Sequence, residues 1–156
     1  MKDKVSINII SSFNHVNFLR LLNNNEEFKW QINDTNYNQI FQVLNNKNLK
    51  LWKKKSDISL IWSTPESISP EFKKLLHNQK ANKNIIKKDI DFFFSSLKSI
   101  KKNSDILLIP NWILREPNES SIALSFSKNL GIDYHLSYMN YYLSELINKE
   151  NNLYLL

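Results

Sequence analysis

Ser12 and His15 are a pair of residues whose types and spacing could carry nucleophilic chemistry. A serine hydroxyl attacks efficiently only when a neighbouring base accepts its proton, and a histidine one helical turn further along the chain could lie near enough to do so. A histidine in the first turn of a helix is, however, usually a solvated surface group. We therefore favour the surface interpretation of His15 over a catalytic one.

Several other kinds of chemistry are excluded or unsupported. The chain has no cysteine, so disulfides and thiolate metal sites cannot form, and a reducing cytoplasm is the simplest location. Its histidines, His15, His77 and His135, lack the spacing of metal ligands, so we expect no metal and no cofactor. Gly131 is the only glycine, which excludes glycine-rich phosphate loops and dinucleotide-binding fingerprints.

The elements that would position a site are short apolar runs separated by amphipathic helices. The runs 57–62 and 105–110 each enter from a charged residue and end in a polar turn, which is typical of strands buried on both faces. The helix predicted over 84–102 carries an apolar stripe and has the length of a crossover between parallel strands. A third run, 5–10, predicts the first strand.

Further elements complete an alternating pattern. We predict a helix after Asn14, an edge strand over 28–32 and a helix over 36–44. A short helix should begin at Pro70 and the last helix at Asp133, followed by a strand starting at Leu153; we leave 112–131 irregular. The chain is then one three-layer α/β domain, 1–156, with a mainly parallel, flavodoxin-like sheet of about five strands in the order 2-1-3-4-5.

Ligands of such sheets bind beyond the carboxyl ends of the strands, and the order 2-1-3-4-5 makes the first and third strands neighbours there. Polar residues follow these strands and the fourth one. Ser11 and Ser12 should therefore face Ser63 and Thr64, with Asn111 nearby. Ser63 and Thr64 also suit an ordinary turn and cap, and Asn111 after Pro110 suits a turn as well.

Short motifs in this order resemble the amino-terminal domain of FkbH-like proteins, in which a domain of SGNH/GDSL-hydrolase type precedes a HAD-type domain. The motifs are Ser11-Ser12-Phe13-Asn14 after the first strand, Tyr37-Asn38-Gln39 after the second, Ser56-Asp57 before the third, and Met139-Asn140 in the last helix. The resemblance spans nearly the whole chain and implies that residues 1–156 are the amino-terminal part of a longer protein.

Carried over to this sequence, the SGNH pattern places Ser12 at the nucleophile position. The Gly-x-Asn-Asp block is replaced by Ser63-Thr64-Pro65-Glu66, which removes an amide that would stabilise an oxyanion, and an Asp-x-x-His block is absent before Leu156. The resemblance thus predicts a degenerate binding or docking domain of a protein that loads an acyl (glyceryl) unit onto an acyl carrier protein. The alternative is an ester hydrolase or acyltransferase that uses Ser12 and a histidine from sequence beyond residue 156. The expected ligand-binding residues are Ser11, Asn38, Ser63, Thr64 and Asn111.

The net charge of +6 raises nucleic acid as a possible partner, which we weigh against solvated lysines. Only Arg20 and Arg115 could supply guanidinium forks, so we expect no specific nucleic-acid recognition and only weak polyanion binding. Apolar runs are too short for a signal peptide or a membrane span, so we expect no membrane association.

Overall fold

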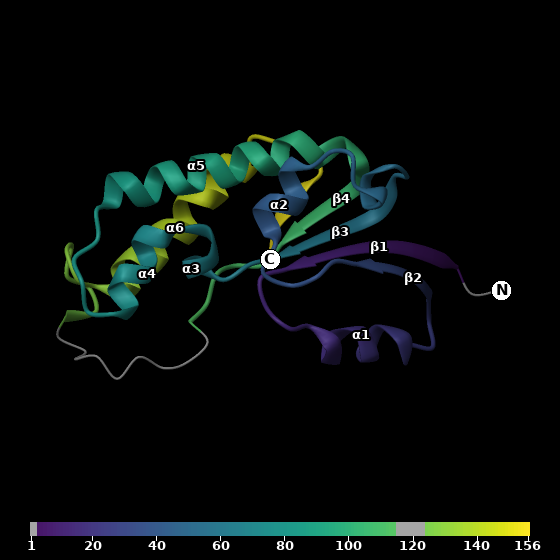
Figure 1. Ribbon diagram of the computed structural model, residues 1–156, viewed down its shortest axis with the longest axis horizontal. Coiled ribbons are helices and arrows are strands. Elements are labelled where there is room, and N and C mark those ends of the chain that lie inside the picture. Colours follow the sequence, from purple (N-terminus) through teal and green to yellow (C-terminus); the bar gives the residue numbers. More distant parts are fainter. Residues whose placement is uncertain (1–2, 115–123) are drawn as a thin grey trace.

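The structure is a computed structural model that describes residues 3–114 and 124–156; part of the 112–131 segment and Arg115 lie outside the described residues. Five parallel strands form one sheet in the order β2-β1-β3-β4-β5, as predicted (Figure 1). The strands are β1 (Lys4–Ser11), β2 (Lys29–Asp34), β3 (Ser56–Trp62), β4 (Ser104–Ile109) and β5 (Leu153–Leu155).

Helices cover the two faces of the sheet unequally (Figure 1). One face is covered by α1 (Val16–Asn23), whose Phe18, Leu19 and Leu22 pack against Ile7 and Ile9 of β1. The other face is covered by α2 (Ile40–Asn45), α5 (Lys83–Ile100) and α6 (Ile132–Ile147). The shorter elements are α3 (Pro65–Ile68), α4 (Pro70–Leu76) and the 3-10 turns Lys50–Trp52 and Lys101–Asn103. No described helix is long and apolar enough to cross a bilayer.

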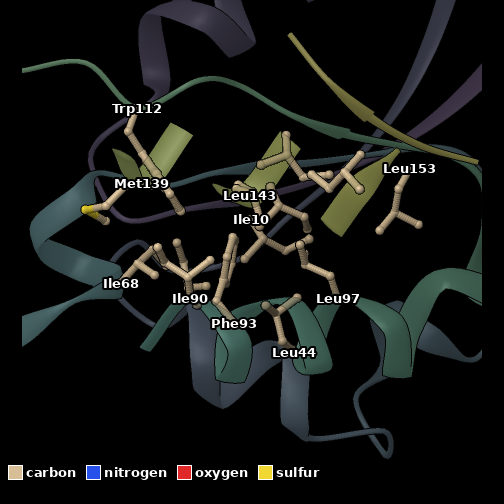
Figure 2. Packing of buried hydrophobic residues seen from close by; sticks show 14 of the residues in the cluster. Ile10, Leu44, Ile68, Ile90, Phe93, Leu97, Trp112, Met139, Leu143 and Leu153 are labelled. Atoms are coloured by element: carbon tan, nitrogen blue, oxygen red, sulfur yellow. The ribbon is translucent and has the colours of Figure 1, made fainter. Parts of the chain in front are cut away.

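The main hydrophobic core lies between the sheet and α5. Ile90, Phe93 and Leu97 project from α5 at helical spacing and are fully buried, as the apolar stripe predicts. Figure 2 shows Phe93 and Leu97 pointing toward Ile10 of β1 and Leu143 of α6. The crossover helix is therefore held to the sheet by the same residues that identify it in the sequence.

The helix predicted over 36–44 begins later than expected. Asn38 has a left-handed backbone with φ of 63°, which a helix cannot include, and its amide donates to the Ser11 carbonyl at 3.0 Å. The helix α2 therefore starts at Ile40, and Tyr37 is exposed instead of lying on the buried helix face. Asparagine adopts a left-handed backbone more readily than most residues, so it can form this turn in a chain that has almost no glycine.

Two smaller predictions also need correction, and a third agrees with the structure. The last helix begins at Ile132, so Asp133 lies in its first turn and is not the cap. Thr64 is the N-cap of α3 and Pro65 its first residue, in agreement with the turn-and-cap interpretation of this segment. The fourth strand is not buried on both faces, since Asp105 is exposed and Ile106 is 39% exposed.

Polar side chains form a row across the sheet, buried in β1, β3 and β4 and exposed at Asn33 of β2. The Asn33 amide of β2 donates to Asn8 Oδ1 of β1 at 3.1 Å, and the Asn8 amide donates to Ser56 Oγ at 3.1 Å and to Ser59 Oγ at 3.3 Å in β3. The Ser56 hydroxyl reaches Ser104 Oγ of β4 at 2.9 Å. This polar ladder thus joins four of the strands by hydrogen bonds between side chains.

Gly131 precedes α6 at a point where two parts of the backbone meet closely. A Cβ atom there would lie 2.4 Å from the carbonyl oxygens of both Ser125 and Ser127, far inside van der Waals contact. The φ angle of −76° is available to any residue, so close packing and not conformational freedom requires glycine. Four residues later, His135 is completely buried, and its Nε2 donates to the Lys128 carbonyl at 3.0 Å.

Candidate functional site

The carboxyl ends of β1 and β3 bring together two of the polar segments predicted to form the site. Ser11 pairs with Trp62 in the sheet register, and the Ser12 amide donates to the Trp62 carbonyl at 3.0 Å. The Thr64 amide in turn donates to Ser12 Oγ at 2.9 Å. Ser12 and Thr64 therefore form a direct link across the edge of the sheet, next to the turn that begins α3.

The Ser12 hydroxyl makes no hydrogen bond to a histidine in the described part of the chain. Ser12 interacts toward β3, whereas His15 is turned toward β2, where its Nε2 lies 3.9 Å from Asp34 Oδ2. His15 is buried, which corrects the surface interpretation, and its Nδ1 atom faces the Phe13 carbonyl at 3.3 Å. Because β1 lies between β2 and β3, the two residues point to opposite sides of the same strand.

Ser11 lies in the same turn but cannot readily contact a ligand. Its side chain is completely buried and closes a small turn, in which Oγ donates to the Phe13 carbonyl at 2.9 Å and accepts from the Phe13 amide at 3.1 Å. Two cavities lie at this edge of the sheet, and Ser11 lines neither of them. Its evident contribution is to shape the turn that presents Ser12.

An apolar cavity of about 460 Å³ opens beyond the carboxyl ends of β3 and β4. Ser63, Thr64 and Asn111 line it together with apolar residues that sequence reasoning missed: Phe13, Trp62, Pro110, Ile113 and Leu156. Two polar groups in its wall are already paired, because Ser63 Oγ accepts from Trp112 Nε1 at 2.8 Å and the backbone N–H of Asn111 donates to the Leu156 carbonyl at 2.8 Å. The cavity therefore suits an apolar group.

A smaller cavity of about 220 Å³ lies on the other side of Ser12. It is lined by Ser12, Asn38, Gln39, Ile40, Phe41, Gln42 and Ser67, a set without any charged side chain. The structure thus places Ser12 and Asn38 in one cavity and Ser63, Thr64 and Asn111 in the other. The motif Tyr37-Asn38-Gln39 could have indicated the polar cavity, whereas the apolar one depends on large residues that are usually assigned to a core.

The aromatic wall of the apolar cavity is rigidly packed. The Trp62 ring makes edge-to-face contacts with Phe13, at 5.0 Å between centroids, and with Phe18 of α1, at 5.4 Å. Such contacts hold a large ring in one orientation at a strand end, where it would otherwise be free to rotate.

The described residues contain no cluster of three or more histidine, aspartate or glutamate side chains placed to hold a metal ion.

The parallel sheet with helices on both faces defines a doubly wound α/β domain. Its candidate site lies at the carboxyl ends of β1 and β3, the topological switch point of the sheet. No protein-family model matches the chain, and no curated protein matches its sequence.

A solved structure does match: the N-terminal part of the protein BF1531 from Bacteroides fragilis, which contains a phosphatase domain and was determined with Mg. The match covers 99% of this chain with a TM-score of 0.69 and 12% sequence identity, and it spans 40% of the other chain. At that identity the likeness shows a shared fold and nothing about activity.

Proposed function

We propose that this chain is a non-catalytic, SGNH-like binding domain of an FkbH-like protein. In this proposal it works beside a HAD-type domain in the same protein and helps to load an acyl (glyceryl) unit onto an acyl carrier protein. The solved structure with the same fold belongs to a protein with a phosphatase domain, and the present chain corresponds to only 40% of it. That arrangement supports a role as one domain of a larger protein.

The observation that carries the non-catalytic assignment is the environment of the Ser12 hydroxyl. Its oxygen accepts a hydrogen bond from the Thr64 amide, which withdraws electron density from the atom that would attack. The described histidine nearest in sequence, His15, is directed to the other side of β1. Without a positioned base, a serine hydroxyl is a weak nucleophile at neutral pH.

The group that could stabilise an oxyanion is also engaged. The Thr64 amide points to Ser12 Oγ and, at 3.2 Å, to Ser67 Oγ, so its hydrogen is shared within the protein. Losing one oxyanion donor costs about 10²–10³ in rate in serine hydrolases. The apolar cavity beside this edge remains open, and we assign binding of an apolar group to it.

The test is to incubate the chain with a small activated ester and with a serine-directed fluorophosphonate, comparing wild type with Ser12→Ala. We expect hydrolysis at the background rate and no labelling in either protein. Ser137→Ala, on α6, is a control for nonspecific labelling. Turnover above background, or labelling lost only in Ser12→Ala, would contradict the binding-domain assignment.

One observation favours the alternative, an ester hydrolase or acyltransferase that uses Ser12. Leu156 lines the apolar cavity and its amide donates to the Ile109 carbonyl at 2.9 Å, so any sequence that followed would start at this edge of the sheet. A histidine supplied from there could approach Ser12. Repeating the fluorophosphonate experiment on a longer chain that contains such a histidine distinguishes the two functions.

A further inference from the structure

We infer that the edge of the sheet binds a neutral amphiphile, with its apolar part in the cavity beside Trp62 and a polyol head group in the cavity beside Asn38. This inference rests on the proposed function, because it extends the binding site assigned there. It adds the second cavity and the chemical class of the whole ligand.

The two cavities are connected through the pair Ser12 and Thr64. Ser12 lines the polar cavity, Thr64 lines the apolar cavity, and the hydrogen bond of 2.9 Å between Ser12 Oγ and the Thr64 amide lies at their boundary. Phe13, the residue after Ser12, already belongs to the apolar wall. One molecule with an apolar part and a polar part can therefore contact both cavities by passing a single pair of residues.

The side chains of the polar cavity can both donate and accept hydrogen bonds. Asn38, Gln39 and Gln42 supply amide groups, each with both donors and an acceptor. The Ser12 oxygen accepts from Thr64, which leaves its hydroxyl hydrogen available to donate. Vicinal hydroxyl groups of a polyol also donate and accept, so they match these side chains, and Phe41 offers an apolar surface for the C–H face of the ligand.

The lining of the polar cavity carries no charged side chain. Among its residues there is no lysine, arginine, aspartate or glutamate to pair with an ionic head group. A charged ligand would lose hydration on entering without gaining an ion pair, whereas a neutral polyol exchanges hydrogen bonds with water for hydrogen bonds with amides. The cavity should therefore discriminate against carboxylates and phosphates of similar size.

The experiment measures binding by tryptophan fluorescence, since Trp62 lines the apolar cavity, and by calorimetry. The ligands are hexyl glucoside below its micelle concentration, hexanol, methyl glucoside and hexanoate. We expect hexyl glucoside to bind at least threefold more tightly than hexanol, and hexanoate no better than hexanol. Equal affinities for hexyl glucoside and hexanol, or tighter binding of hexanoate, would overturn the inference while leaving the apolar site in place. Failure of hexanol itself to bind would contradict both this inference and the binding role assigned to the apolar cavity.

Two variants locate the head group. Asn38→Gly removes the amide but keeps the left-handed backbone, which glycine adopts without strain, so folding is preserved. It should weaken hexyl glucoside about threefold to tenfold, the loss expected for one or two neutral hydrogen bonds, and leave hexanol unchanged. The matched control is Asn78→Gly, at another exposed asparagine with a left-handed backbone and outside both linings, which should change neither affinity. An Asn38→Gly protein that binds hexyl glucoside like wild type would refute the assignment of the polar cavity.

Discussion

The substitution Gly131→Ala should destabilise the domain, although a change from glycine to alanine at such a φ angle would ordinarily stabilise it. Removing glycine reduces the entropy of the unfolded chain and contributes about 0.4–1 kcal/mol in favour of folding. Against this, the new Cβ atom would lie 2.4–2.5 Å from three backbone atoms of Ser125 and Ser127. Backbone atoms cannot rotate away as the end of a flexible side chain can, so the upper part of the usual overpacking range, about 2–3 kcal/mol, applies.

The net expectation is a loss of about 1–2.5 kcal/mol in the free energy of unfolding, the difference between these two effects. For a chain of this length, that loss lowers the melting temperature by about 2–10 °C. Calorimetry and urea denaturation would measure both quantities. Asn17→Ala, on the exposed side of α1, is the control and should stay within about 0.5 kcal/mol of wild type. A Gly131→Ala protein as stable as wild type would refute the packing argument.

The remaining predictions concern the core, pH and charge. Phe93→Ala should cost about 3–5 kcal/mol in urea denaturation because the ring is fully buried, and a loss under 1 kcal/mol would contradict this. Burial lowers the pKa of His135, against the effect of its hydrogen bond to the Lys128 carbonyl, so the folded state favours the neutral ring. The free energy of unfolding should therefore fall as pH drops below about 6.5, where the unfolded histidine takes up a proton first; His135→Gln should reduce this slope, and an unchanged slope would exclude His135 as its source. Binding to DNA should be independent of sequence and disappear at moderate salt, and filter binding that survives high salt would contradict the view that the lysines are solvated.

The fold could be predicted from the sequence because its signals are periodic and local. The apolar run of β3, the stripe of Ile90, Phe93 and Leu97, and the alternation of strands with helices lead to a parallel sheet and to its strand order. Errors arose where one residue's backbone decided the outcome. Asn38 looks like a helical residue in the sequence, yet its left-handed conformation delays α2.

The site could be predicted less completely. Its polar residues follow strand ends, so the contact between Ser12 and Thr64 is expected from the strand order. The direction of the His15 side chain depends on which side of β1 the chain turns, and the sequence pattern does not contain that information. The apolar cavity was missed because Phe13 and Trp62 resemble core residues until the end of the sheet leaves them partly exposed.

The polar ladder from Asn33 through Asn8 and Ser56 to Ser104 has a consequence for how the chain finds its strand pairing. Apolar strands rich in isoleucine and leucine can slide past one another with little change in buried area, so hydrophobic contact alone tolerates misaligned sheets. A slip of one residue would turn these amides and hydroxyls away from their partners and leave the buried ones, Asn8, Ser56 and Ser104, without hydrogen bonds. The ladder thus penalises wrong alignments more than it stabilises the correct one, and by fixing the register of the strands it also fixes which residues meet at the binding edge.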